Sequence, residues 1–229
     1  MIPFSTLDII AIVWYAAFWA LFSFVVDHSP LSHRNLSHLM NGHRRRWVKN
    51  MANRDLRMID TAIITGLQNG TAFFASTSLL AIGAGFALLN STDLALQVTR
   101  DLSLPVETTR ALWETKALSL ICIYVYAFFK FGWAYRLFNY TSILIGALPY
   151  HKSTSPEDME IAIEQVAEIN SLAGRHFNLG LRAFFFSLAL FGWFIHPMLL
   201  IAATTFVGMV LVRRQFFSRS QKLATRLLP

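Results

Sequence analysis

The stretch of sequence that decides the fold runs from Asp60 to Asn90 and reads DTAIITGLQNGTAFFASTSLLAIGAGFALLN. It is long and apolar enough to cross a bilayer, which takes about 20 predominantly apolar residues in a helix. Polar side chains nevertheless interrupt it: Thr65, Gln68, Asn69, Thr71, Ser76, Thr77 and Ser78. Because a helix turns by about 100° per residue, one side collects polar and small residues: Thr61, Thr65, Gln68, Ala72, Ser76 and Gly83. This stripe is predicted to face protein or water instead of lipid.

Two interpretations of the stripe remain open. In the first, its polar side chains line a pathway for a solute or an ion. In the second, they bond across a helix interface, as polar side chains in membranes commonly do. Gly66 and Gly70 are four residues apart, the spacing that lets two helix backbones approach closely in lipid. The candidate pathway or interface residues are Thr65, Gln68, Asn69, Thr71 and Ser76.

The composition excludes an ordinary soluble domain. Of the 229 residues, 55% are hydrophobic and only 14% are charged, and the hydrophobic residues come in long blocks. The formal net charge of +7 comes from basic clusters beside these blocks, where anionic lipid headgroups are a more natural partner than nucleic acid. Cys122 is the single cysteine, so the chain cannot form an internal disulfide or a cysteine-based zinc site. We expect no cofactor.

The hydrophobic blocks predict an all-α, polytopic membrane protein with a single integral membrane domain over residues 1–229. About four transmembrane segments are expected, at 7–26, at 61–89, at 113–136 with an extension to 148, and at 183–212. Residues 28–59 are rich in arginine and lysine, which is typical of a cytoplasmic loop. We therefore predict a multi-pass protein of the inner membrane with this basic loop in the cytoplasm.

A separate amphipathic helix is expected over residues 155–173. Ser155 is a favourable N-cap and Pro156 suits the first helical position. The acidic residues of this helix share one side: Glu157, Glu160, Glu164 and Glu168. A carboxylate-bridged metal centre would need accompanying Glu-x-x-His pairs, which the segment lacks. We expect the acidic side to pair with the basic loop.

The basic loop also contains four histidines spaced five residues apart: His28, His33, His38 and His43. Five residues turn a helix by about 500°, so successive imidazoles would point about 140° apart and could not converge on one metal ion. No carboxylate or cysteine stands among them. We interpret them as loop and interfacial histidines and predict no metal site.

His196 and Pro197 divide the last hydrophobic block. Since proline lacks a backbone N–H, the helix must kink or break at this point. We favour a single kinked crossing. The alternative is that residues 183–212 fold back at His196 and Pro197 as a re-entrant pair of half-helices, which would bring the basic C-terminal residues to the side of the basic loop and satisfy the positive-inside rule better. A second group of candidate site residues consists of charged or polar residues near the hydrophobic blocks and the two residues at this break: Asp60, Lys130, Arg136, Asn178, Arg182, His196 and Pro197.

Three groups of residues resemble a known family. They are LQNGTAFFAS at 67–76, then Phe129-Lys130-Phe131 with Arg136, Asn139 and Tyr140, and Asn178-x-Gly180-x-Arg182-Ala183-Phe184. Through them most of the chain is similar to the bacterial membrane-protein family called domain of unknown function 599. The resemblance implies an integral membrane protein with about four hydrophobic segments. It implies no activity and no catalytic residue.

Three functions are compatible with these patterns. The first is a channel or a transporter of a small solute or ion, formed by a homo-oligomer because four helices are few for a private pathway. The second is a structural or assembly subunit that binds another membrane protein. The third is a membrane-embedded enzyme acting on a lipid or quinone, for which no catalytic motif is present. We favour the first and expect a protein that is not an enzyme.

Overall fold

The computed structural model describes residues 4–101, 109–150 and 153–226. Their helices are α1 (Thr6–Asp27), the 3₁₀ helix η1 (Pro30–Arg34), α2 (Leu36–Ala52), α3 (Met58–Asn90), α4 (Thr92–Asp101), α5 (Arg110–Ala147), α6 (Pro156–Ile195), α7 (Pro197–Phe216) and α8 (Arg219–Arg226). Five segments are long and apolar enough to cross a membrane, namely α1, α3, α5, α6, and α7 with α8. The all-α class is confirmed, while the candidate spans number five where about four were expected.

Local sequence accounts for where the helices begin. The Ser5 side chain accepts the backbone N–H of Asp8, and the Asp8 carboxylate accepts the backbone N–H of Ser5, so α1 starts with a capping box. Ser155 caps α6 and Pro156 is its first residue, as the sequence predicts. The predicted helix over 155–173 is therefore real, but it continues without a break to Ile195.

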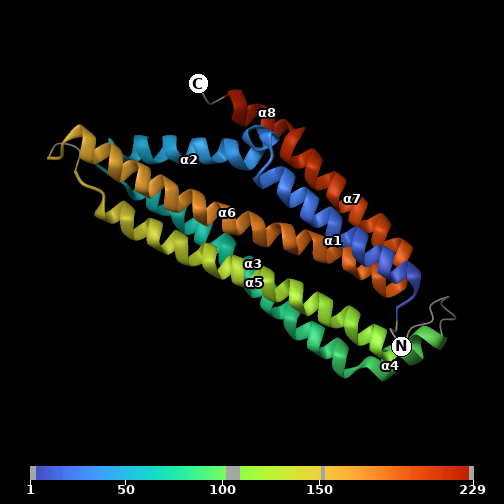
Figure 1. Ribbon diagram of the computed structural model, residues 1–229. Helices are drawn as coiled ribbons and strands as arrows, with labels where there is room; N and C mark the ends of the chain where they lie inside the picture. The colour runs from blue at the N-terminus through green and yellow to red at the C-terminus, as the bar shows by residue number, and fades with distance from the viewer. Residues whose placement is uncertain (1–3, 102–108, 151–152, 227–229) are drawn as a thin grey trace.

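Helix length divides the molecule into two parts. At roughly 1.5 Å per residue, α1 and α7 are about 33 and 30 Å long, whereas α3, α5 and α6 are about 50, 57 and 60 Å long. Figure 1 shows α1 and α7 beside one half of α6 and α2 along the other half. We call the part in which α1 and α7 lie together with α3, α5 and α6 the five-helix part. The extension consists of α2 with residues 58–69, 133–147 and 156–175.

Side-chain contacts fix the directions of the helices in the five-helix part. Trp193 on α6 donates a hydrogen bond to Asp8 at the start of α1, with an Nε1 to Oδ1 distance of 2.8 Å. Arg182, eleven residues earlier on α6, pairs with Asp27 at the end of α1. The two helices are therefore antiparallel, with the two contacts about 17 Å apart along α6 and about 29 Å apart along α1.

Each part has its own hydrophobic core. In the five-helix part, the Phe186 ring stacks on Trp19 with centroids 5.4 Å apart, and Tyr15, Phe22 and Trp193 are buried in the same cluster. The core of the extension joins four helices through residues of smaller volume: Val48, Met51, Ile64, Ile145, Ile163 and Val166. The extension is therefore packed as a small bundle and is not a set of loose helix ends.

The chain reverses direction at His196 and Pro197. His196 has extended backbone angles, φ −161° and ψ 142°, and its side chain accepts the backbone N–H of Met198 as the N-cap of α7. α7 then returns alongside α6, so closely that a Cβ on Gly192 would lie 2.9 Å from the carbonyl oxygen of Leu199 (Figure 1). This corrects the favoured single kinked crossing over 183–212. The reason is that proline disfavours helical geometry in the residue before it.

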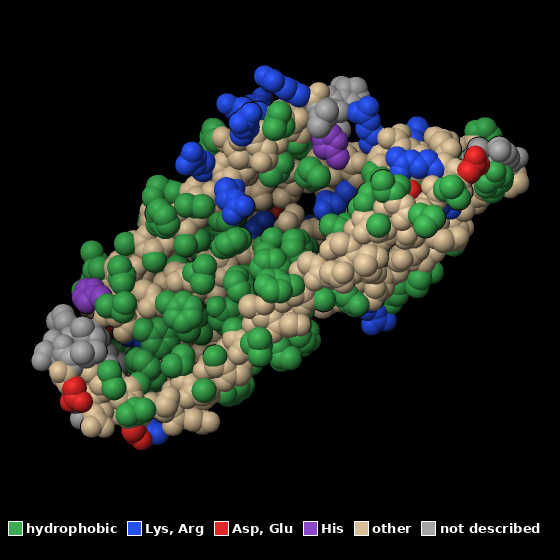
Figure 2. All heavy atoms as spheres, turned by 180° about the vertical axis from the view of Figure 1, so that it is seen from behind, with side chains coloured by type: hydrophobic (Ala, Val, Ile, Leu, Met, Phe, Trp, Pro, Cys, Tyr) green, Lys and Arg blue, Asp and Glu red, His purple; other side chains and the backbone are tan. Residues whose placement is uncertain are grey.

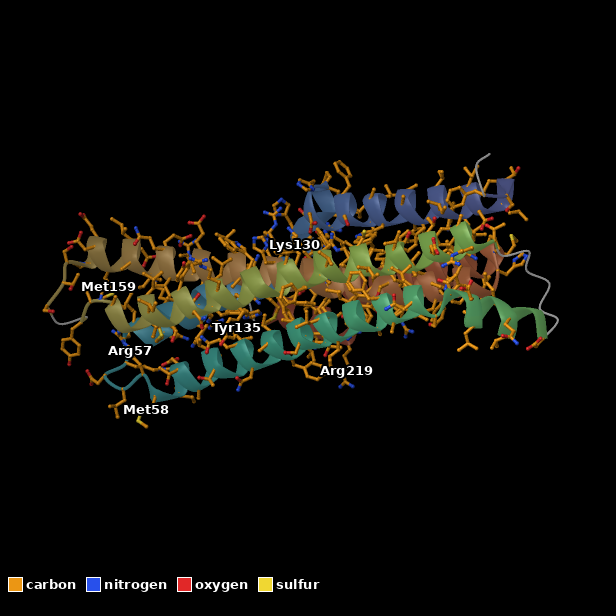
Figure 3. All side chains as sticks on the ribbon, turned by 90° about the horizontal axis from the view of Figure 1, so that it is seen from below. Arg57, Met58, Lys130, Tyr135, Met159 and Arg219 are labelled. Carbon is orange, nitrogen blue, oxygen red and sulfur yellow. The ribbon has the colours of Figure 1, made fainter. Side chains whose placement is uncertain are left out.

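Ion pairs join α2 to the first half of α6. Arg45 lies 2.6 Å from Glu164, and Lys49 lies 3.3 Å from Glu160. The predicted pairing between the acidic side of this helix and the basic segment is confirmed for these residues. Because the four side chains are about half exposed, the pairs contribute little to stability. Figure 3 shows Arg57, Met58 and Met159 at the tip of the extension.

Candidate functional site

One side of α6 carries polar or small residues at every fourth position: Asn170, Gly174, Asn178 and Arg182. Residues four apart lie on the same side of a helix, so they form a column. We call it the polar column of α6. It contacts α2 through Gly174 and Asn178 and α1 through Arg182, so it runs from the extension into the five-helix part.

Arg182 is the most deeply placed charge of the column, with 6% of its surface exposed. Its Nη1 and Nη2 atoms donate to the two carboxylate oxygens of Asp27 at 2.8 and 3.1 Å. This bidentate geometry is characteristic of a guanidinium paired with a carboxylate. The guanidinium also lies 5.3 Å from the centre of the Phe22 ring. The pair is neutral as a unit, and it is held by α1 and α6 together.

A hydrogen-bonded trio lies one turn along the column from Arg182. Asn178 on α6 and Gln215 on α7 each donate to the Ser37 hydroxyl on α2, at 3.2 Å in both cases. Three helices that are far apart in sequence meet here through neutral polar groups. Such groups can exchange partners with a ligand at small cost, because each net hydrogen bond is worth only about 1 kcal/mol.

Arg44 on α2 is packed against the backbone of α6 at Gly174. A Cβ at Gly174 would lie 2.5 Å from the guanidinium carbon, so the absence of a side chain at Gly174 leaves room for Arg44 in this position. Arg44 donates to Asn41 at 2.8 Å, and no carboxylate of the described residues pairs with it. Burial lowers the pKa of Arg44 below its ordinary value. An anion beside it would compensate that desolvation.

A cavity of about 520 Å³ opens where α2, α6 and α7 meet. We call it the amphiphilic cavity, because its polar lining is Arg44, Arg182, Arg214, Ser37, Asn178 and Gln215. Its apolar lining includes five aromatic or aliphatic groups of the five-helix part: Phe22, Phe74, Phe177, Phe185 and Leu211. No carboxylate is among the described residues that line it. Figure 2 shows a hollow on this face with lysine or arginine side chains at its edge and hydrophobic ones beside it.

A second cavity of about 300 Å³ adjoins the first, between the end of α1, η1, α2 and α6. We call it the polar cavity. Ser37, Asn178 and Arg182 line both cavities, so the two meet at the polar column of α6. The remaining lining is mostly polar and carries both signs of charge, in contrast to the amphiphilic cavity.

The predicted polar stripe lies on α3, at the edge of the molecule beside α5. Gln68 donates to Asn139 on α5 at 2.6 Å, and Thr71 is buried with its hydroxyl bonded to the Leu67 carbonyl. Thr65, Asn69 and Ser76 are exposed. The stripe therefore divides between an interface with α5 and an open side, and none of these five residues lines either cavity.

The second group of predicted site residues is dispersed. Asp60 is fully buried and accepts hydrogen bonds from Trp47 and Arg54, so it ties α2 to the start of α3. Lys130 lies over the Tyr126 ring at 5.2 Å, near the middle of the long helices (Figure 3). Arg136 donates to Tyr140. Only Asn178 and Arg182 of this group line the cavities.

The histidine series does not form one cluster in the described part of the chain. His28 stacks on Phe24, and His43 lies 2.9 Å from the carbonyl oxygen of Ala224 on α8. The rings of His33 on η1 and His38 on α2 meet edge to face, 4.9 Å apart, because the helix changes direction between them. No group of three or more metal-binding side chains occurs among the described residues.

The comparison with protein families matches the model of DUF599, described as a protein of unknown function, over residues 10–220. The chain belongs to the DUF599 family. Neither the curated proteins nor the solved structures contain a match to this DUF599 chain. Family membership and the five apolar helices together indicate a helical membrane protein of unknown function.

The sequence carried one signal for the site of this DUF599 protein that hydrophobicity alone does not reveal. Asn170, Gly174, Asn178 and Arg182 are evenly spaced by four, and this spacing marks a polar side on an otherwise apolar helix. By contrast, Ser37, Arg44 and Arg214 stand in ordinary polar or basic contexts. Their place at the cavity depends on the packing of α2 and α7 against α6, which no local pattern encodes.

Proposed function

We propose that this protein binds an anionic amphiphile at the level of the lipid headgroups. The observation that carries the proposal is the lining of the amphiphilic cavity: guanidinium groups on one side, phenylalanine rings on the other, and no carboxylate among the described residues. Since Asp27 neutralises Arg182, the positive charge available to a ligand comes from Arg44 and Arg214. Guanidinium groups are well suited to phosphate and carboxylate.

The position of the cavity supports a ligand that comes from the bilayer. The cavity lies at the end of α1 and α7, the two helices whose length matches a hydrocarbon core, and just before the extension begins. At about 520 Å³ it falls in the range of small-molecule sites and suits a headgroup with the first part of its chain. We place this end on the cytoplasmic side of the inner membrane, because the arginines of α2, α7 and α8 all gather there.

The proposal is tested by lipid binding to the purified full-length protein, measured by native mass spectrometry with an added anionic phospholipid. Replacing Arg44→Gln and Arg214→Gln together is expected to lower affinity by roughly tenfold or more, because charge-assisted hydrogen bonds are lost. Arg213→Gln is the matched control, since Arg213 is adjacent and exposed but lines neither cavity. Equal lipid affinity in all three proteins would refute the proposal.

A channel between subunits is a second candidate. It is favoured by the exposed polar residues Thr65, Asn69 and Ser76, which share the open side of α3 and would need a second copy of the chain to enclose a path. Reconstituted vesicles are expected to show flux above empty liposomes, reduced in a Gln68→Ala variant. Vesicles without such flux would count against the channel. Co-purification with another membrane protein at fixed stoichiometry would favour an assembly subunit instead.

A further inference from the structure

The polar cavity adds information about the ligand. It adjoins the amphiphilic cavity at Ser37, Asn178 and Arg182, on the side away from the phenylalanine rings. A phosphate held by Arg44 and Arg214 therefore has two directions in which its two ester substituents can lie. The acyl-bearing side fits the apolar lining, and the other substituent points toward the polar cavity.

The charged groups of the polar cavity balance each other. Asp27 and Glu168 contribute two negative charges, and Arg175 and Arg182 contribute two positive charges. Asp27 and Arg182 neutralise each other as a pair, and Glu168 and Arg175 are exposed, so solvent screens their charges; the exposed His38 completes the titratable lining. A second phosphate or an ammonium group would meet both carboxylates and guanidinium groups, so neither gains net attraction from this lining to offset its desolvation. The balance therefore favours a substituent without net charge.

The neutral lining supplies hydrogen bonds for such a group. Ser32 and Ser171 line the polar cavity, and neither side chain makes a hydrogen bond to another described residue. Ser37 and Asn178 complete the lining at the boundary between the cavities. Hydroxyl groups both donate and accept, so serines of this kind match a hydroxylated partner in either role.

We infer that the preferred ligand is a phosphodiester lipid whose headgroup beyond the phosphate is an uncharged polyol, with phosphatidylglycerol as the simplest example. The inference rests on the proposed function, because it assigns the headgroup of the same ligand. The phosphate is held in the amphiphilic cavity, and the polyol enters the polar cavity between α1, α2 and α6.

The test compares lipids that share chains and charge. Phosphatidylglycerol and phosphatidylethanol are both phosphodiester monoanions, and only the first carries free hydroxyl groups. Native mass spectrometry of the full-length protein, with both lipids in competition, is expected to show phosphatidylglycerol bound roughly fivefold to tenfold more tightly, as one or two net hydrogen bonds would give. Phosphatidylserine and phosphatidylethanolamine serve as the charged and zwitterionic comparisons.

Two serine variants test whether the polar cavity produces the preference for phosphatidylglycerol. Ser171→Leu fills the polar cavity and is expected to abolish the preference while leaving phosphatidylethanol affinity unchanged. Ser76→Leu, on the exposed side of α3, is expected to keep the preference. Equal affinity for the two lipids in the unmodified protein, or a preference that survives Ser171→Leu, overturns the inference but leaves the proposed function standing. Failure of every anionic lipid to bind overturns the proposed function as well.

Discussion

α3 and α6 are both long apolar helices with polar residues at intervals, yet they use those residues differently. On α3, Thr65 and Thr71 bond to carbonyl groups of their own helix, and Gln68 reaches only its neighbour α5. On α6, Asn178 and Arg182 bond to α2 and α1 and line two cavities. The difference arises from position, because α3 lies at the edge of the molecule and α6 lies at its centre (Figure 1).

Polarity within an apolar helix is therefore not sufficient to indicate a site. A threonine or serine hydroxyl can satisfy itself on the preceding turn, so it need not have a partner elsewhere. An arginine or an asparagine cannot do so as easily, and each needs groups from other helices when it is buried. Asn178 and Arg182 of α6 are of this second kind.

The largest expected effect concerns Asp27, whose loss would leave Arg182 buried without its partner. Asp27→Ala is expected to lower the free energy of unfolding by about 3 kcal/mol or more, because removing one member of a buried pair leaves an uncompensated charge. Tryptophan fluorescence during thermal unfolding in detergent measures it. The double variant Asp27→Ala with Arg182→Leu is expected to recover much of the loss. An unchanged melting temperature in Asp27→Ala would show that the pair does not hold α1 to α6.

An intermediate effect is expected where Arg44 packs against α6. Gly174→Ala introduces a methyl group that displaces the Arg44 guanidinium, so affinity for an anionic phospholipid should fall severalfold while the helix itself is retained. Gly70→Ala is the matched control, because no atom of the described part of the chain lies within 4 Å of a Cβ built on that residue of α3. If both alanines lower lipid affinity equally, the close contact at Gly174 does not position Arg44.

The smallest effect is expected on α3. Gln68→Ala removes one hydrogen bond to Asn139 and should lower the free energy of unfolding by about 0.6 kcal/mol, a typical value for a bond between membrane helices. Asn69→Ala, one residue further and exposed, should change it by much less. Both are measured by the same fluorescence experiment. An Asn69→Ala loss as large as that of Gln68→Ala would indicate that a second subunit covers the open side of α3.

Sequence reasoning predicted several elements of the fold because their causes are local. The apolar blocks, the Ser155 cap and the ion pairs between acidic α6 and basic α2 depend on neighbours within a turn or on simple charge. The favoured single crossing over 183–212 was incorrect, because a proline fixes where a helix stops but not where the chain goes next. The return of α7 depends on the close approach at Gly192.

For the site, the sequence singled out Asn178 and Arg182 but gave equal weight to Lys130, Arg136 and Asp60, which lie elsewhere. It drew attention to α3 because polar residues are conspicuous there. The ligand-facing residues of α2 and α7 could not be chosen in advance, since arginines near helix ends are common and only contact with α6 distinguishes Arg44 and Arg214 from their neighbours.

Local sequence features are enough to identify an all-helical membrane protein of the DUF599 family, because hydrophobicity, caps and charge clusters act over short distances along the chain. Three features became visible in the folded molecule alone: α7 folds back, α3 lies at the edge, and Arg44, Arg182 and Arg214 surround one cavity. Those outcomes depend on which helix faces pack together. Packing is settled by the shapes of side chains from distant segments, such as Gly174 against Arg44, and no single stretch of sequence contains both partners.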